Sequence, residues 1–305
     1  MAETAPSSRR WLVTGGTGQV GRAIGETPLP ANVALFAPGR DILDLADLCD
    51  MEEFLKRENI TAIINCAAFT AVDRAEQEEE LATSINGDAP RMIAEAAVKL
   101  DIPLVHLSTD YVFRGDKAEG AYNEEDEVDP INAYGRSKLA GEQAVLASGA
   151  RAIILRTAWV VSPFGNNFVK TMLRLAATYP RLRVVADQFG NPTSAHDIAG
   201  VAVRLLDRLE TEAGAADGIF HFVNSGSTSW HGLASRILTD RNDAPPVDAI
   251  ATSDYPTPAA RPANSRLDTA RLTQYHGIIP RDWQSAIDEI VMRLERENMD
   301  EVMAQ

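Results

Sequence analysis

The run Trp11–Thr14 (WLVT) followed by Gly15–Gly21 (GGTGQVG) decides the fold class of this chain. The first run has the apolar pattern of a strand, and the glycines after it satisfy both GxGxxG and GxxGxxG. Glycine permits a tight turn from strand to helix and lets the backbone approach a pyrophosphate, which the N-terminal amides of the next helix then bind. A glycine-rich turn without a ligand has the same letters, so the surrounding pattern must decide between the two.

That pattern is an alternation of short apolar runs with longer stretches of helical period. The apolar runs are Val33–Phe36, Ala62–Cys66, Pro103–Ser108 and Ala152–Thr157, and the helical stretches are Met51–Glu58, Ala82–Lys99 and Tyr134–Ala147. Strands that alternate with helices favour a parallel sheet covered on both faces. We therefore predict an α/β protein with a doubly wound parallel Rossmann sheet, in which the glycine run is a dinucleotide-binding turn.

The pattern changes after about residue 160, where a smaller C-terminal substrate-binding lobe is expected. The predicted helices are Asn167–Thr178, His196–Glu212 and Trp283–Glu297, the predicted strands are Leu182–Ala186 and Gly218–Val223, and Asn242–Asn264 has the composition of irregular backbone. We expect the chain to pass between the sheet and the lobe. The predicted division gives 1–160 and 196–228 to the NAD(P)-binding Rossmann domain, and 161–195 and 229–305 to the lobe.

Composition narrows the class of protein. A chain of 305 residues with 45% hydrophobic content suits one large α/β unit or a large domain with a smaller one. The net charge of −15 argues against binding to nucleic acid or to an anionic membrane surface. Cys49 and Cys66 have no metal-binding spacing, which is typical of a reduced cytoplasmic protein.

The ends of the chain and its apolar runs carry two further expectations. Residues Met1–Arg10 are small and polar, so they do not have the pattern of a signal peptide, and the first eight are expected to form a disordered extension. No apolar run approaches the roughly 18 residues that a membrane span needs.

A second motif, Tyr134-Gly135-Arg136-Ser137-Lys138, places a phenol and an ammonium on one helical face. A neighbouring ammonium stabilises a phenolate and lowers the pKa of the phenol, which makes the phenol a better proton shuttle. YxxxK also occurs by chance on solvated helix faces. Here Ser108 and Thr109 end an apolar strand some 25 residues earlier, at the sheet edge where ligands bind in open parallel sheets. The Thr109 hydroxyl could then donate to a substrate carbonyl.

The cofactor preference depends on the end of the second strand. A carboxylate about 20 residues past the glycines would bind the ribose 2′-hydroxyl of NAD. The strand is followed instead by Ala37-Pro38-Gly39-Arg40, and Asp41 comes one residue later. Arg40 could meet a 2′-phosphate or be an ordinary loop arginine, so the sequence favours NADPH and leaves NADH open.

With these motifs in this order, the chain resembles the extended short-chain dehydrogenases and, within them, the dTDP-4-dehydrorhamnose reductases. The resemblance extends from about Trp11 to about Trp283. Its carriers are GGTGQVG (15–21), INCAAFTAVDRAE (64–76), STDYVFRG (108–115), NAYGRSKLAGE (132–142), RTAWVV (156–161), GNNFVKTMLRLA (165–176), DQFGNPTSA (187–195) and YPTPAARPANSRLDT (255–269).

The resemblance implies NAD(P)H-dependent reduction of dTDP-4-dehydro-L-rhamnose to dTDP-L-rhamnose by a cytoplasmic monomer or homodimer, without a catalytic metal. It implies the catalytic residues Thr109, Tyr134 and Lys138. With the glycine turn and the strand end, the expected cofactor site is Gly15, Gly18, Gln19, Val20, Arg40, Asp44, Leu45, Ala67, Ala68, Thr70, Tyr134 and Lys138. The expected nucleotide-sugar site is Thr109, Asp110, Tyr111, Trp159, Asn167, Gln188, Asn191, Arg261 and Asn264. Trp159 could instead be core, Arg261 could be merely exposed, and Asn86 could support a proton relay near Lys138.

Other functions share parts of this pattern. An epimerase or dehydratase acting on another nucleotide sugar would have the same turn and YxxxK, but dehydratases usually have an acidic pair after the strand-end Ser/Thr, and here Asp110 is followed by Tyr111. A regulatory subunit of methionine adenosyltransferase type would bind NADP without catalysis. Some family members form metal-bridged dimers through a glutamate just after the glycine turn, where this chain has Arg22-Ala23-Ile24.

Overall fold

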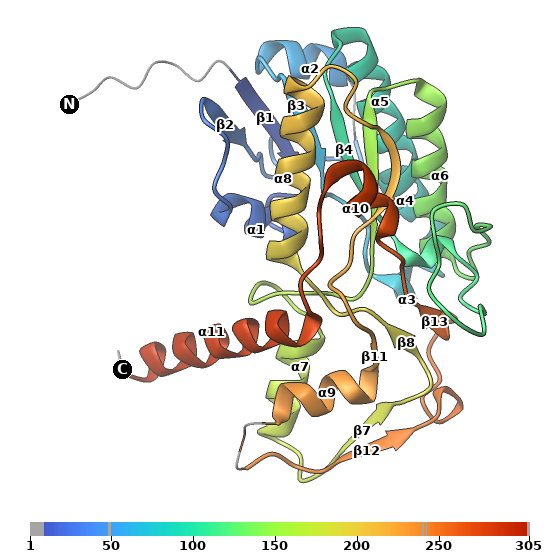
Figure 1. Ribbon diagram of the computed structural model, residues 1–305, viewed down its shortest axis with the longest axis vertical. Helices are drawn as coiled ribbons and strands as arrows, with labels where there is room; N and C mark the ends of the chain where they lie inside the picture. Colours follow the sequence, from blue (N-terminus) through green and yellow to red (C-terminus); the bar gives the residue numbers. More distant parts are fainter. Residues whose placement is uncertain (1–8, 48–49, 240, 242, 304–305) are drawn as a thin grey trace.

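A six-stranded parallel sheet forms the centre of the computed structural model, which describes residues 9–47, 50–239, 241 and 243–303 (Figure 1). Its order is β10-β5-β4-β3-β1-β2, and every neighbouring pair is parallel. The strands are β1 (Arg9–Thr14), β2 (Val33–Phe36), β3 (Ala62–Asn65), β4 (Leu104–Thr109), β5 (Ala152–Thr157) and β10 (Gly218–His221). The strand order reverses at β1, which makes its carboxyl end a topological switch point. The predicted N-terminal extension and Cys49 lie outside the described residues.

Helices cover both faces of this sheet, as the alternation of its side chains requires. Trp11 and Val13 of β1 pack in one cluster with α1 (Gln19–Glu26) and α8 (Ala195–Thr211). Leu12 points to the other face and packs with the second group of helices. That group is α2 (Met51–Arg57), α5 (Ala89–Leu100) and α6 (Ala133–Ser148). The predicted doubly wound fold class is thereby confirmed.

The predicted single helix over Ala82–Lys99 is wrong. The chain there forms α4 (Glu79–Thr83), a π-helical turn at Ser84–Asp88 and then α5. The Asn86 amide bonds both backbone groups of Phe69 and also donates to Ser137 Oγ. A Cβ on Gly141 would lie 2.1 Å from the Asn86 carbonyl oxygen, so this glycine lets α6 meet the wide turn. Helical periodicity cannot reveal a π turn that tertiary hydrogen bonds hold open. The Asn86 side chain thus ties α6 to the loop after β3.

A second, smaller group of elements packs around its own apolar cluster. Figure 1 shows β7, β12, α7 and α9 gathered at the end of the molecule opposite α2. The elements are α7 (Phe168–Ala176), β7 (Leu182–Val185), α9 (Trp230–Leu238), β12 (Val247–Ile250) and α11 (Trp283–Met303). The short strands are β6 (Val160–Val161), β8 (Phe189–Gly190), β9 (Thr193–Ser194), β11 (Thr228–Ser229) and β13 (Asn264–Ser265), and the other short helices are α3 (Val72–Ala75), η2 (Asp110–Val112), η3 (Thr252–Asp254) and α10 (Ala270–His276). The exact division at residues 160, 196 and 229 stays a prediction.

Irregular backbone was predicted over Asn242–Asn264, and β12 corrects this in part. Val247–Ile250 pairs in parallel with Leu182–Val185. A two-stranded ribbon satisfies its backbone groups across the pair, so its sequence needs no strong alternation of its own. Asn242 itself lies outside the described residues. None of the helices that the structure describes is long and apolar enough to cross a bilayer.

Candidate active site

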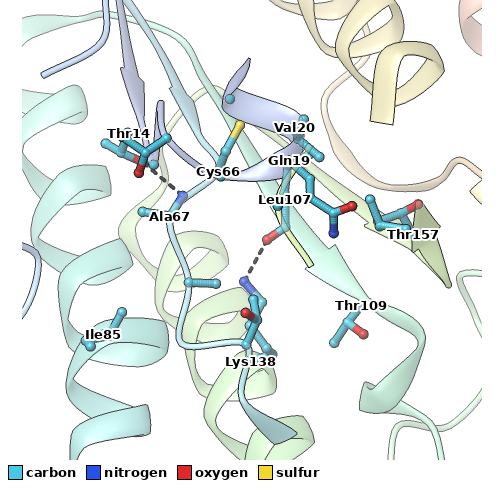
Figure 2. A pocket seen from close by; sticks show the side chains of 18 of the residues that line it. Thr14, Gln19, Val20, Cys66, Ala67, Ile85, Leu107, Thr109, Lys138 and Thr157 are labelled. Atoms are coloured by element: carbon cyan, nitrogen blue, oxygen red, sulfur yellow. Dashed lines mark hydrogen bonds between the residues drawn. The ribbon is translucent and has the colours of Figure 1, made fainter. Parts of the chain in front are cut away.

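A cleft of about 860 Å³ opens at the carboxyl ends of β1, β3, β4 and β5. Figure 2 shows Thr14, Ala67, Leu107, Thr109, Lys138 and Thr157 around it, carried by four strand ends and α6. Phe168 and Trp230 of the smaller lobe line it as well. The cleft therefore lies between the sheet and the lobe, where parallel sheets with a switch point bind their ligands.

The glycine turn forms one end of the cleft and has the shape of an anion cradle. Gly15 has φ +67°, and a Cβ on it would lie 2.7 Å from Ala67 Cα. A Cβ on Gly21 would lie 2.2 Å from the Gly15 carbonyl oxygen. Gly18 begins α1 with no side-chain cap, so the amides of Gln19 and Val20 have no capping side chain competing for them. Glycine backbone and uncapped helix amides fit the pyrophosphate of a dinucleotide.

A buried network fixes the loop that follows β3. Thr14 Oγ1 donates to Asn65 Oδ1 at 2.5 Å and accepts from the Ala67 amide at 3.2 Å, the latter drawn in Figure 2. Asn65 Nδ2 lies 2.9 Å from His106 Nδ1. Burial, with a further contribution from Lys138, holds the pKa of His106 far below its usual range, so the imidazole is neutral. The network therefore places Ala67 and Ala68 against the glycine turn.

Tyr134 and Lys138 lie in the first turns of α6, whose start is fixed from three sides. The Asn132 side chain accepts from the Gly135 amide at 2.8 Å and donates to the Ala260 carbonyl at 2.9 Å. A Cβ on Gly135 would lie 2.2 Å from the Tyr111 carbonyl oxygen, so the helix touches the loop after β4. Lys138 Nζ is buried and donates to the Leu107 carbonyl at 2.7 Å (Figure 2).

The electrostatics of this pair differ from the prediction in one respect. Burial lowers the pKa of Lys138 to about 8, while the Glu142 carboxylate opposes the fall. Burial also raises the pKa of the Tyr134 phenol above its usual value, against the predicted lowering. The reason is that the Lys138 ammonium bonds the Leu107 carbonyl rather than the phenol. Tyr134 is therefore a neutral phenol at physiological pH, ready to donate a proton.

Thr109 and Asp110 lie beside Tyr134 at the end of β4. The Thr109 hydroxyl donates to Asp110 Oδ1 at 3.1 Å and accepts from the Tyr111 amide at 3.2 Å, and the Tyr134 phenol lies close enough to interact with it. Asp110 is 4% exposed, and its burial raises the pKa of the carboxyl to about 7, with Ser265 and Thr109 opposing the rise. The rings of Tyr111 and Tyr134 meet edge to face, with centroids 5.5 Å apart.

An aromatic pair forms the wall on the lobe side. Trp159 has φ +47°, and its ring stacks on Trp230 with centroids 3.6 Å apart and planes 11° apart. A Cβ on Gly190 would lie 2.5 Å from the Trp159 ring, so glycine is required for this approach. The Phe168 ring also packs on Trp230, with ring centroids 4.7 Å apart. Trp159 therefore lines the cleft rather than lying in the core.

Most of the predicted cofactor and sugar residues line this one cleft. They are Gly15, Gly18, Gln19, Val20, Arg40, Asp44, Leu45, Ala67, Ala68, Thr70, Thr109, Asp110, Tyr111, Tyr134, Lys138, Trp159 and Asn167. Arg40 is exposed at the rim. The Asn167 amide donates to Gln19 Oε1 at 3.1 Å and caps α7, so it joins the lobe to the glycine turn.

Four predicted sugar residues lie outside the cleft lining. Asn191 accepts from the Leu267 amide and donates to Gly226, while Asn264 donates to the Lys117 and Gly120 carbonyls. Gln188 donates to Thr252 at 3.1 Å. Arg261 pairs with Asp73 at 2.8 Å and keeps one buried guanidinium nitrogen without a hydrogen-bond partner. The first three side chains hold loops, and Arg261 has a buried nitrogen left to donate.

The structure also brings in residues that the sequence reasoning did not select. They are Cys66, Thr157, Trp230, Ser162 and Ser265. Thr157 pairs in register with Thr109 on the neighbouring strand, a signal that the strand alignment could have given. Ser265 follows Asn264 in a quoted motif, whereas Trp230 begins a helix that was not predicted. Arg22, at the position discussed for metal-bridged dimers, packs over the Phe164 ring at 4.2 Å.

Comparison with known proteins assigns a family to this architecture. The family model described as RmlD substrate binding domain matches residues 9–296. A dTDP-4-dehydrorhamnose reductase of Sinorhizobium fredii is 43% identical over 95% of this chain and 99% of its own, and one of Aggregatibacter actinomycetemcomitans is 40% identical over 92% and 98%. The crystal structure of the Bacillus anthracis dTDP-4-dehydrorhamnose reductase in complex with NADP is 34% identical, with a TM-score of 0.87 over 93% of this chain and 99% of that one.

Proposed function

Because the chain belongs to the dTDP-4-dehydrorhamnose reductase family, we propose that it reduces dTDP-4-dehydro-L-rhamnose to dTDP-L-rhamnose with NADPH, or with NADH. The observation that supports this most is the convergence of Thr109, Tyr134 and Lys138 on a cleft whose other end is a glycine cradle. This arrangement suits ketone reduction, since the neutral Tyr134 phenol and the Thr109 hydroxyl can both hydrogen-bond the oxygen of a bound ketone.

In the proposed mechanism Thr109 and Tyr134 bind the oxygen of the C4 ketone. When bound, the reduced nicotinamide supplies the hydride equivalent for C4. The Tyr134 phenol gives its proton to the carbonyl oxygen as negative charge develops there, and the charged Lys138 stabilises the phenolate left behind. The cofactor would lie across Gly15, Gly18, Gln19, Val20, Ala67, Ala68 and Thr70, with Asp44 and Leu45 toward the adenine.

The sugar nucleotide would lie between the strand ends and the lobe. Tyr111 and Trp159 would contact the sugar, Asp110 would lie at this site behind the Thr109 hydroxyl, and the stacked Trp159–Trp230 pair offers a flat apolar wall for the sugar ring. Arg261 has one guanidinium nitrogen without a partner that could donate to a diphosphate. Asn167, Gln188, Asn191 and Asn264 would shape the loops around this site. The proposed division into a cofactor domain and a nucleotide-sugar lobe follows the same boundaries as the prediction.

Cofactor binding should weaken as pH rises through the pKa of Lys138. The ammonium is charged below about pH 8 and loses its charge above it. We expect the charged Lys138 to donate a hydrogen bond to the bound cofactor, and a hydrogen bond from a charged group is worth about 1.5–3 kcal/mol. The Kd for NADPH should therefore rise about tenfold between pH 7 and pH 9. Fluorescence titration of NADPH measures this, and Lys138→Met should abolish the pH dependence. Equal Kd values at both pH values in the wild type would contradict the role of Lys138.

Arg40 should distinguish the two cofactors. Arg40→Ala removes a guanidinium from the rim where a 2′-phosphate would lie, so the Kd for NADPH should rise by about tenfold or more. NADH lacks this phosphate and serves as the internal control, with an unchanged Kd. Calorimetric titration of both cofactors checks the prediction, and equal losses for the two would count against it.

The reaction itself is tested by following oxidation of the reduced cofactor. The keto sugar is generated from dTDP-glucose by the upstream enzymes and then offered with NADPH or NADH. Oxidation that requires the sugar supports the reductase. Tightly held NAD that cycles without net consumption would support an epimerase or dehydratase, and cofactor binding without turnover would support a regulatory subunit of methionine adenosyltransferase type.

We further propose a cytoplasmic protein that is a monomer or a homodimer. The reduced-type cysteine pattern and the acidic charge support the location. Among the residues that the structure describes, no three His, Cys, Asp or Glu side chains form a group that could hold a metal ion. Light scattering with and without a chelator would test the oligomeric state.

A further inference from the structure

The Thr109 hydroxyl has one hydrogen to donate and two possible acceptors for it, the Asp110 carboxylate and the ketone of the substrate. It accepts from the Tyr111 amide at 3.2 Å, and its hydrogen points to Asp110 Oδ1 at 3.1 Å. A hydroxyl offers one donor and two acceptor sites, so the bond to Asp110 uses its whole donor capacity. With its hydrogen held by the Asp110 carboxylate, Thr109 cannot also donate to a substrate ketone.

The Asp110 carboxyl is built so that this hydrogen can be released. It is buried at the wall of the cleft, and its Oδ2 makes no well-formed hydrogen bond, although the Ser265 hydroxyl of β13 lies close enough to interact with the carboxyl. A protonated carboxyl is itself a donor. If Asp110 carries a proton, it can donate to Thr109 Oγ1, and the Thr109 hydrogen is then free to turn into the cleft.

We propose that Asp110 is a positioning residue that reverses its hydrogen bond with Thr109, so that Thr109 donates to the substrate ketone only when the Asp110 carboxyl is protonated. The proposal rests on the proposed reductase function and adds a protonation requirement to it. Asp110 acts through Thr109, because Thr109 and Tyr134 are the groups that meet the ketone.

The surroundings of the carboxyl allow it to titrate in the working pH range. Its burial places the pKa at about 7. The other titratable groups that face it are the phenols of Tyr134 on α6 and Tyr111 on η2, both neutral because burial raises the pKa of each. Beyond Tyr111 lies the Arg261–Asp73 ion pair, whose opposite charges shift the pKa of Tyr111 in opposite directions. Of these groups, only the Asp110 carboxyl changes charge close to neutral pH.

The decisive experiment compares pH profiles of the wild type, Asp110→Asn and Glu124→Gln. In the wild type kcat should fall by about twentyfold between pH 6 and pH 8. About tenfold of this comes from Asp110, whose protonated form decreases through its pKa, and about twofold comes from Lys138. The amide introduced by Asp110→Asn can donate to Thr109 at every pH, so this variant should be active at pH 6 and lose only about twofold by pH 8, the part due to Lys138. Glu124 is a half-buried carboxyl of raised pKa that bonds the His221 amide, and its replacement should leave the wild-type profile.

A second readout needs neither substrate nor cofactor. The infrared carbonyl band of a protonated carboxyl should disappear as pH rises through about 7 in the wild type and in Glu124→Gln, and it should be absent in Asp110→Asn. If the wild type reduced no sugar, the proposed function would be wrong. The infrared band would still show whether the Asp110 carboxyl titrates, so the two failures can be told apart. The proposal itself is overturned if Asp110→Asn follows the wild-type pH profile, if the folded variant is inactive at pH 6, or if no such band titrates.

Discussion

Replacement of Tyr134 by phenylalanine is expected to lower kcat by about 10²- to 10⁴-fold, the usual contribution of a positioned general acid. The phenol is half-buried and neutral and lies beside Thr109, so the change removes the proton donor and little else. The ring still fits beside Tyr111, and the glycine cradle is untouched. Steady-state kinetics with the keto sugar measures the loss, and fluorescence titration should give an almost unchanged Kd for NADPH.

A matched control is Tyr275→Phe, which removes a phenol from an exposed ring that does not line the cleft. Its kcat should equal that of the wild type. Near-normal turnover by Tyr134→Phe would show that another group protonates the ketone oxygen.

The second large effect is expected for stability, at the ion pair beneath the active site. Glu142 on α6 accepts from Arg156 Nε at 2.9 Å and Nη2 at 2.6 Å, and from Ser108 Oγ at 2.5 Å. Both charged side chains are at most 3% exposed. Glu142→Ala leaves the Arg156 charge buried without its partner, and such a loss costs about 3–5 kcal/mol of unfolding free energy. Urea denaturation monitored by circular dichroism measures it.

The exposed pair between Arg136 on α6 and Glu79 on α4 provides the control. Its side chains are 46% and 45% exposed, so Glu79→Ala should cost about 1 kcal/mol or less. Replacing both buried partners by apolar residues, as in Glu142→Leu with Arg156→Met, should recover much of the stability because no charge is left unpaired. Equal costs at the two sites would contradict the assignment of the buried pair as a structural tie between α6 and β5.

The central fold could be predicted because its signals are local. Strands buried on both faces appear as continuous apolar runs, and the glycine turn fixes where the first of them ends. Val33–Phe36 and Ala152–Thr157 were predicted with the bounds that the structure has. The π turn at Asn86 and the strand β12 were missed, since each depends on partners distant in the sequence.

The candidate site divides in the same way. Residues next to strand ends, such as Thr109 and Ala67, were predictable, because parallel strands deliver their carboxyl ends to one edge. Trp230 and Ser265 belong to the lobe, and their positions at the site depend on how the lobe packs against the sheet domain. The raised pKa of the Tyr134 phenol follows from burial and from the nearby Asp110 carboxylate, and a sequence shows neither of these directly.

The most direct test of the central claim is to follow the hydride into the product. The chain is incubated with dTDP-4-dehydro-L-rhamnose and NADPH that carries deuterium at the transferable position, and the sugar is analysed by mass spectrometry and proton NMR. We predict one deuterium at C4 of dTDP-L-rhamnose, with one cofactor oxidised per sugar reduced. A folded, cofactor-binding protein that leaves the ketone unreduced, or a product without deuterium at C4, would contradict the account.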